Sequence, residues 1–184
     1  MEQQQPLQKT IVLVGMMGAG KSSVGRALAL RLGVPFWDLD GAIERAAGKT
    51  VAEIFADHGE ACFRHRESLM IAQLLHEPPG VLATGGGAFV SAKNRALIAD
   101  WAVSVWLDAD IELLWQRVRH QKTRPLLQTP TPRETLATLH GQRLPKYRQA
   151  RLRLKVKPHL TETALANKIA DCLQQCPDAS GRII

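Results

Sequence analysis

The chain has 184 residues, a hydrophobic fraction of 45% and a net charge of +7. This length allows one well-buried domain and is short for two. The polar N-terminus lacks a signal-peptide pattern and no apolar run is long enough to cross a membrane, so we expect a cytoplasmic protein without a membrane partner. Three cysteines without metal spacing argue against a disulfide framework or a zinc site.

Basic residues are concentrated between residues 117 and 157, which include twelve Lys or Arg and a single acidic residue, Glu134. Such a bias favours anionic ligands. The same region has one aromatic residue, Tyr147, and so lacks the stacking side chains of a nucleic-acid site. Small ligands that carry phosphate and carboxylate fit this charge as well as nucleic acid does, and we expect the small ligands as partners.

Residues 10–23 predict a strand, a glycine-rich turn and the start of a helix. Residues 15–22, Gly-Met-Met-Gly-Ala-Gly-Lys-Ser, fit the phosphate-binding pattern G-x-x-x-x-G-K-[ST]. Glycines bring bare backbone N–H groups to phosphate oxygens, Lys21 reaches the β- and γ-phosphates, and the Ser22 hydroxyl can bind Mg²⁺. The expected nucleotide contacts in this stretch are Gly18, Ala19, Gly20, Lys21, Ser22 and Ser23.

Five strands separated by helical patterns are predicted at residues 10–14, 35–37, 81–84, 102–107 and 152–156. Repeated strand–helix units indicate a mostly parallel five-stranded sheet in a three-layer α/β/α domain. The predicted helices include one starting at the Thr50 capping box, one at 60–75, one at about 91–99, one from Asp110 to about 120, one from Thr131 and one at 161–174.

We expect a single domain over residues 1–184, with a core at about 10–175. A mobile lid is predicted at about 119–132, because residues 121–131 have no clear periodicity and two prolines. Residues 177–184 are expected to fray. Trp101, Trp106 and Trp115 fall within or beside apolar patterns and are expected in the core.

Two carboxylates, Asp38 and Asp40, follow the second predicted strand, at the sheet edge where open α/β sheets bind ligands. One of them can hold Mg²⁺ through water, and the other can accept a proton from an attacking hydroxyl. A solvated turn with a helix-capping Asp would explain the same residues.

The chain resembles the shikimate kinase family, which has a nucleoside monophosphate kinase-like fold. The resemblance depends on six motifs that occur together and in the family's order between about residues 11 and 156: Gly-Met-Met-Gly-Ala-Gly-Lys-Ser (15–22), Asp-Leu-Asp (38–40), Phe-Arg-His-Arg-Glu (63–67), Ala-Thr-Gly-Gly-Gly (83–87), Arg-Pro-Leu-Leu (124–127) and Arg-Leu-Pro-Lys-Tyr (143–147).

The resemblance implies transfer of phosphate from ATP to the 3-hydroxyl of shikimate with Mg²⁺, giving ADP and 3-phosphoshikimate. It places Ser22 and Asp38 at the metal and assigns catalysis to Lys21, Asp40 and Arg124. Arg117 would pack against adenine. The implied substrate contacts are Asp40, Arg64, Gly86, Gly87 and Arg143, the two arginines binding the carboxylate. Glu67 is expected to orient Arg64 by an ion pair.

Three other functions remain open at this point: another small P-loop kinase such as a gluconate kinase, a GTP-dependent switch, and a nucleic-acid-associated NTPase. Arg64 and Arg143, as a pair that binds a carboxylate, together with the three glycines at 85–87 favour shikimate over gluconate as the substrate. A switch would need an Asn-Lys-x-Asp segment, and the sequence has none. The ligands expected are ATP or ADP and shikimate, bound by a monomer.

Overall fold

The computed structural model describes residues 7–121, 124–175 and 182–183. Its sheet contains the strands β1 (Thr10–Val14), β2 (Phe36–Asp38), β3 (Val81–Ala83), β4 (Ala102–Ala109), β5 (Leu152–Val156) and β6 (Arg182–Ile183). Their order is β2-β3-β1-β4-β5-β6, and all neighbours are parallel. The parallel sheet with its five predicted strands is confirmed, and β6 is an addition at one edge.

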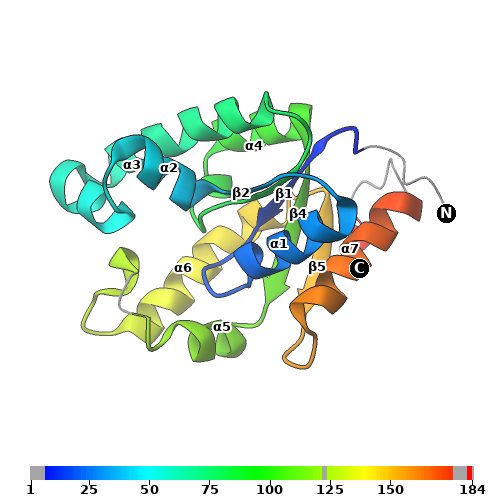
Figure 1. The fold of residues 1–184 in the computed structure, drawn as a ribbon. Coiled ribbons are helices and arrows are strands. Elements are labelled where there is room, and N and C mark those ends of the chain that lie inside the picture. The colour runs from blue at the N-terminus through cyan, green and yellow to red at the C-terminus, as the bar shows by residue number, and fades with distance from the viewer. Residues whose placement is uncertain (1–6, 122–123, 176–181, 184) are drawn as a thin grey trace.

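Helices lie on both sides of the sheet (Figure 1). They are α1 (Lys21–Leu32), α2 (Leu39–Ala47), α3 (Val51–Leu75), α4 (Ala92–Trp101), α5 (Ile111–Val118), α6 (Pro132–Tyr147) and α7 (Glu162–Gln175), with short 3₁₀ turns η1 (Ala88–Val90) and η2 (Pro125–Leu127). Helix α1 packs on α7, α3 packs on α4, and α5 packs on α6. No helix in the described ranges is long and apolar enough to cross a membrane.

Strand β1 is the centre of the core, because every one of its residues is buried. It pairs with β3 on one side and β4 on the other. Parallel pairing brings the carboxyl ends of β1, β2 and β3 to one edge of the sheet. The turn after Val14, the acidic residues after Trp37 and the glycines after Ala83 therefore lie close together.

Helix α3 is interrupted at Gly59, whose φ of 76° and ψ of 174° are not helical. A side chain rarely adopts this positive φ, so glycine is suited to the break. Before it, Thr50 and Glu53 form the predicted capping box. After it, the helix continues from Glu60 to Leu75, as the sequence indicated.

The structure corrects one of the expectations about the core tryptophans. Trp106 is 2% exposed, as predicted, but Trp101 is 51% exposed and packs against the His76 ring at 5.1 Å. Trp101 is the last residue of α4. In the expected tail, residues 182–183 pair with β5, and the other residues of 177–184 lie outside the described ranges. Residues 122–123 of the expected lid also lie outside the described ranges.

Candidate active site

The turn after β1 shapes a pocket of backbone groups at the start of α1. Gly15, Gly18 and Gly20 all have positive φ, and a Cβ on Gly15 would lie 2.7 Å from the Leu107 carbonyl oxygen. Gly20 precedes α1 and supplies no side-chain cap, so the first N–H groups of the helix stay available to an anion. This is the geometry that the phosphate-binding pattern predicted.

Lys21 lies inside this turn and is 9% exposed. Its Nζ donates to the carbonyl oxygens of Gly15 at 2.9 Å and Met16 at 2.8 Å. Burial lowers the pKa of Lys21 to about 8, an effect that Asp40 opposes and Arg124 reinforces. A phosphate beside this amine would replace the missing solvation and favour its charged form.

Ser22 and Asp38 meet where α1 begins and β2 ends. The Ser22 hydroxyl donates to Asp38 Oδ2 at 2.5 Å, while Asp38 Oδ1 accepts from the Gly41 N–H at 3.3 Å. Hydroxyl and carboxylate oxygens are ligands that Mg²⁺ prefers. The described residues contain no group of three or more His, Cys, Asp or Glu that could hold a metal. Mg²⁺ commonly takes one or two protein oxygens and completes its shell with phosphate and water.

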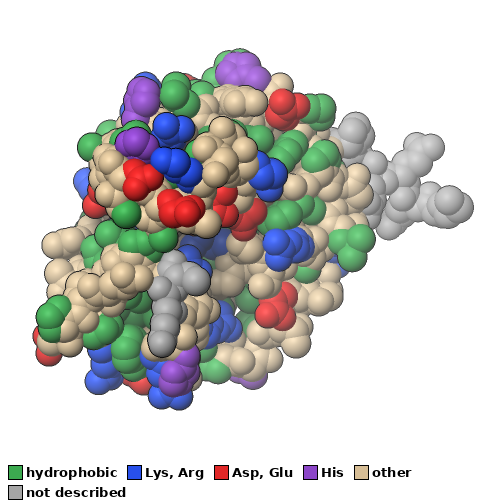
Figure 2. All heavy atoms as spheres, turned by 60° about the vertical axis from the view of Figure 1, so that its left-hand side comes forward, with side chains coloured by type: hydrophobic (Ala, Val, Ile, Leu, Met, Phe, Trp, Pro, Cys, Tyr) green, Lys and Arg blue, Asp and Glu red, His purple; other side chains and the backbone are tan. Residues whose placement is uncertain are grey.

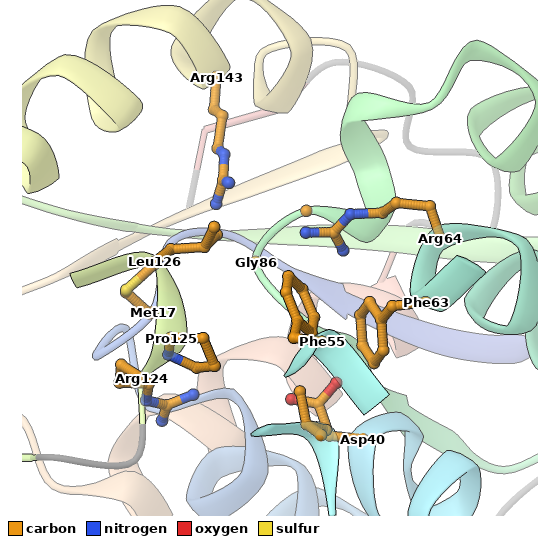
Figure 3. Close-up of a pocket in the computed structure, with 13 residues that line it drawn as sticks. Met17, Asp40, Phe55, Phe63, Arg64, Gly86, Arg124, Pro125, Leu126 and Arg143 are labelled. Carbon is orange, nitrogen blue, oxygen red and sulfur yellow. The ribbon is translucent and has the colours of Figure 1, made fainter. Parts of the chain in front are cut away.

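A hollow opens between the turn after β1, the glycines after β3, α3 and η2 (Figure 3). Asp40 points into it, and the Oδ1 atom of Asp40 is buried without a hydrogen-bond partner. Burial, followed by the nearby charge of Asp38, raises the pKa of Asp40. The hollow therefore contains an acceptor that calls for a donor from a ligand.

Arg143 and Arg64 enter the same hollow from α6 and α3 (Figure 3). Arg143 is 7% exposed. Arg64 Nη1 donates to both carboxylate oxygens of Glu67 at 2.9 and 3.0 Å, and its Nη2 donates to Glu60 at 3.0 Å. The expected ion pair of Glu67 with Arg64 is confirmed, and burial raises the pKa of Glu67.

The glycines after β3 let the two arginines approach the backbone. A Cβ on Gly87 would lie 2.4 Å from Arg64 Cζ, and one on Gly86 would lie 3.3 Å from Arg143 Nη1. A side chain at Gly87 would displace the Arg64 guanidinium, and one at Gly86 would require a shift of a few tenths of an ångström. Two guanidinium forks and adjacent backbone N–H groups form a site suited to a carboxylate.

Arg117 and Arg124 lie near the phosphate turn. Arg117 Nη1 donates to the Gly18 carbonyl oxygen at 3.1 Å, which brings this α5 residue to the expected nucleotide site. Arg124 lines the hollow and is close enough to Lys21 to affect its pKa. Figure 2 shows the side from which the hollow opens, with recessed basic side chains below a group of acidic ones.

The structure brings together every residue that the sequence singled out for the site, but it also adds an apolar wall. Met17, Phe55, Phe63 and Leu126 line the hollow, and the Phe55 and Phe63 rings lie 4.9 Å apart. Phe63 precedes Arg64 in a motif and offered a signal. Leu126 lies in the Arg-Pro-Leu-Leu motif at 124–127, whereas nothing in the local sequence separated Phe55 from ordinary core residues.

Comparisons with known proteins agree on one family. A family model described as shikimate kinase matches residues 17–174. A shikimate kinase of Cereibacter sphaeroides is 54% identical, over 94% of this chain and 86% of that protein, and one of Ruegeria pomeroyi is 59% identical over 79% and 75%. The solved shikimate kinase of Acinetobacter baumannii in complex with shikimate has a TM-score of 0.85 and 40% identity, covering 91% of this chain and 93% of that one.

Proposed function

The chain belongs to the shikimate kinase family, and from this premise we propose that it transfers the γ-phosphoryl group of ATP to the 3-hydroxyl of shikimate. The products are ADP and 3-phosphoshikimate, an intermediate on the route to chorismate and the aromatic amino acids. The enzyme is a phosphotransferase with an alcohol as acceptor.

The observation that carries this proposal is the pairing of two unmet needs in one hollow. The buried Oδ1 of Asp40 requires a donor, and the Arg143 guanidinium forms no ion pair within the part of the chain that the structure describes, whereas Arg64 is already held by Glu60 and Glu67. A ring acid with several hydroxyls meets both needs, because its hydroxyls can donate to Asp40 while its carboxylate contacts the arginines. Phe55 and Phe63 supply an apolar wall for the ring.

We infer that the donor nucleotide binds at the phosphate turn, which adjoins this hollow through Met17. The N–H groups from Gly18 to Ser23 surround the phosphates, and Arg117 contacts the adenine side. Lys21 leaves the carbonyls of Gly15 and Met16 for phosphate oxygens. Arg124 adds positive charge where negative charge spreads over the transferring group.

Mg²⁺ would be held by Ser22 directly and by Asp38 through water, consistent with the oxygen pair at this position. When bound, it neutralises charge on the β- and γ-phosphate oxygens. The Ser22 and Asp38 side chains already lie in contact, so little reorganisation of the chain is needed.

Asp40 binds the ring hydroxyls and accepts the proton of the 3-hydroxyl as the phosphoryl group transfers. Its raised pKa makes it a better proton acceptor than an exposed carboxylate. The positive charges of Lys21 and Arg124 favour its ionised form at the start of the reaction. Positioning and charge neutralisation supply most of the catalysis, as in other phosphoryl transfers.

We test the reaction by measuring ADP release with Mg-ATP and no acceptor, shikimate, quinate or gluconate. Stimulation by shikimate above the other acceptors is expected. Stimulation by gluconate alone, or by none of them, would overturn the assignment. We also propose that the enzyme is cytoplasmic and that it is a monomer. One chain supplies all of the groups of the site, which supports the monomer, and light scattering of the purified protein measures its mass.

A further inference from the structure

Tyr147 ends the motif at 143–147, yet the reaction described above gives it no part. It is 1% exposed, and its hydroxyl donates to the Gly86 carbonyl oxygen at 2.5 Å. Burial raises its pKa to about 12, so the hydroxyl remains a donor at neutral pH. A buried hydroxyl aimed at the backbone of the substrate-binding loop calls for an explanation beyond packing.

The ring of Tyr147 is fixed against the sheet. It stacks on Trp106 of β4 with ring centroids 6.1 Å apart and an interplanar angle of 28°. The Arg153 guanidinium packs over the same indole at 4.8 Å, and Asp108 accepts from Arg153 Nε at 2.8 Å. This series of contacts ties the hydroxyl to the paired strands β4 and β5.

The hydroxyl bond has a direct consequence for the next backbone group. A peptide unit is planar and trans, so the Gly86 C=O and the Gly87 N–H point in opposite directions. Because Tyr147 takes the carbonyl on one side, the Gly87 N–H is directed away from Tyr147. Gly86 and Gly87 both line the hollow, so this peptide forms part of the substrate-binding wall.

Tyr147 also lies one helical turn after Arg143 on α6. The two side chains approach the same sulfur, since Met16 Sδ is 3.6 Å from Tyr147 Oη and 3.9 Å from Arg143 Nη1. The Met16 carbonyl oxygen in turn accepts from Lys21. Tyr147 thus donates a short hydrogen bond to the substrate loop, whereas its contact with the phosphate turn is to the Met16 sulfur, a weak acceptor.

We propose that Tyr147 is a positioning residue for the acceptor substrate: its hydroxyl orients the Gly86–Gly87 peptide and its ring fixes the end of α6, so that the Gly87 N–H and the Arg143 guanidinium meet the substrate together. This inference rests on the proposed function. The proposed role predicts different effects on the binding of the two substrates, because the hydroxyl acts on the acceptor site and leaves the phosphate contacts of Lys21 in place.

The test is Tyr147→Phe, which keeps the ring and its stack on Trp106 and removes the hydroxyl. We expect the KM for shikimate to rise about 5- to 30-fold, since the Gly86 carbonyl loses its donor, while the KM for ATP changes less than about twofold. Calorimetric titration of shikimate and ADP should show the same split in dissociation constants.

Thr84→Val is the matched control. The Thr84 hydroxyl is also buried and also donates to a backbone carbonyl, that of Leu13 at 2.9 Å, but it does not contact the Gly86–Gly87 peptide. It should lower the melting temperature without the split in KM values. A similar rise for both substrates in Tyr147→Phe, an unchanged KM for shikimate, or an equal shikimate effect in Thr84→Val would overturn the positioning role.

The two proposals fail in different ways. A wild-type enzyme without shikimate-stimulated ADP release refutes the reaction itself. A wild-type enzyme that is stimulated, together with a Tyr147→Phe variant that keeps its KM for shikimate, refutes the positioning role alone.

Discussion

Replacing Arg143 by Lys should weaken the binding of shikimate far more than that of ATP. Lys keeps the positive charge but loses the planar fork that contacts two carboxylate oxygens at once. Arg143 is 7% exposed, so water cannot take the place of the lost contact. A hydrogen bond to a charged group contributes about 1.5 to 3 kcal/mol, which corresponds to about a 10- to 150-fold rise in the KM for shikimate.

Steady-state kinetics with each substrate varied in turn measure this effect. Arg148→Lys is the control, because Arg148 follows α6 directly and is exposed. It should leave both KM values unchanged. Equal increases in the KM for shikimate and for ATP in the Arg143→Lys variant would refute the carboxylate-binding role, since they would indicate general damage to the site.

Three further predictions follow from the geometry of the site. With a pKa of about 8, the free Lys21 amine is largely neutral at higher pH, and bound phosphate should raise this pKa. The affinity for ADP should therefore fall by up to about tenfold per pH unit above 8. Calorimetry in buffers of different ionisation enthalpy should detect proton uptake on binding, and the absence of proton uptake would contradict the lowered pKa of the buried amine. Gly87→Ala should displace Arg64 and raise the KM for shikimate at least about tenfold, because its Cβ would lie 2.4 Å from Cζ, and unchanged kinetics would show that the contact is not used. Gly141→Ala, inside α6 with no atom within 4 Å of the new Cβ, should instead stabilise the fold by about 0.5 to 1 kcal/mol and raise the melting temperature by about 1 to 4 °C in calorimetry.

The sequence predicted the parts of the fold that depend on local pattern. The bounds of β1 and β5 agree with those predicted, because the first is a continuous apolar run and the second alternates buried and half-buried residues. The contact of Ser22 with Asp38 also follows from the predicted parallel sheet, because the carboxyl ends of parallel strands meet at one edge.

The features that the sequence did not predict depend on contacts between distant segments. Tyr147 and Gly86 are 61 residues apart, and their hydrogen bond exists only because α6 packs beside the glycine loop. Trp101 was expected in the core but is exposed. For an apolar residue at the end of a helix, the sequence pattern does not distinguish a buried position from an exposed one. The two residues of β6 are too few to show a period.

The break in α3 at Gly59 has a consequence for how the enzyme opens to solvent. The segment before the break carries Phe55 of the apolar wall, and the segment after it carries Arg64. With no continuous ladder of helical hydrogen bonds across Gly59, the first segment can unfold locally while the second remains intact. Backbone amides on the two sides should therefore exchange with deuterium as separate cooperative units, and Phe55 should open at a lower free-energy cost than Phe63 and Arg64, which follow the break.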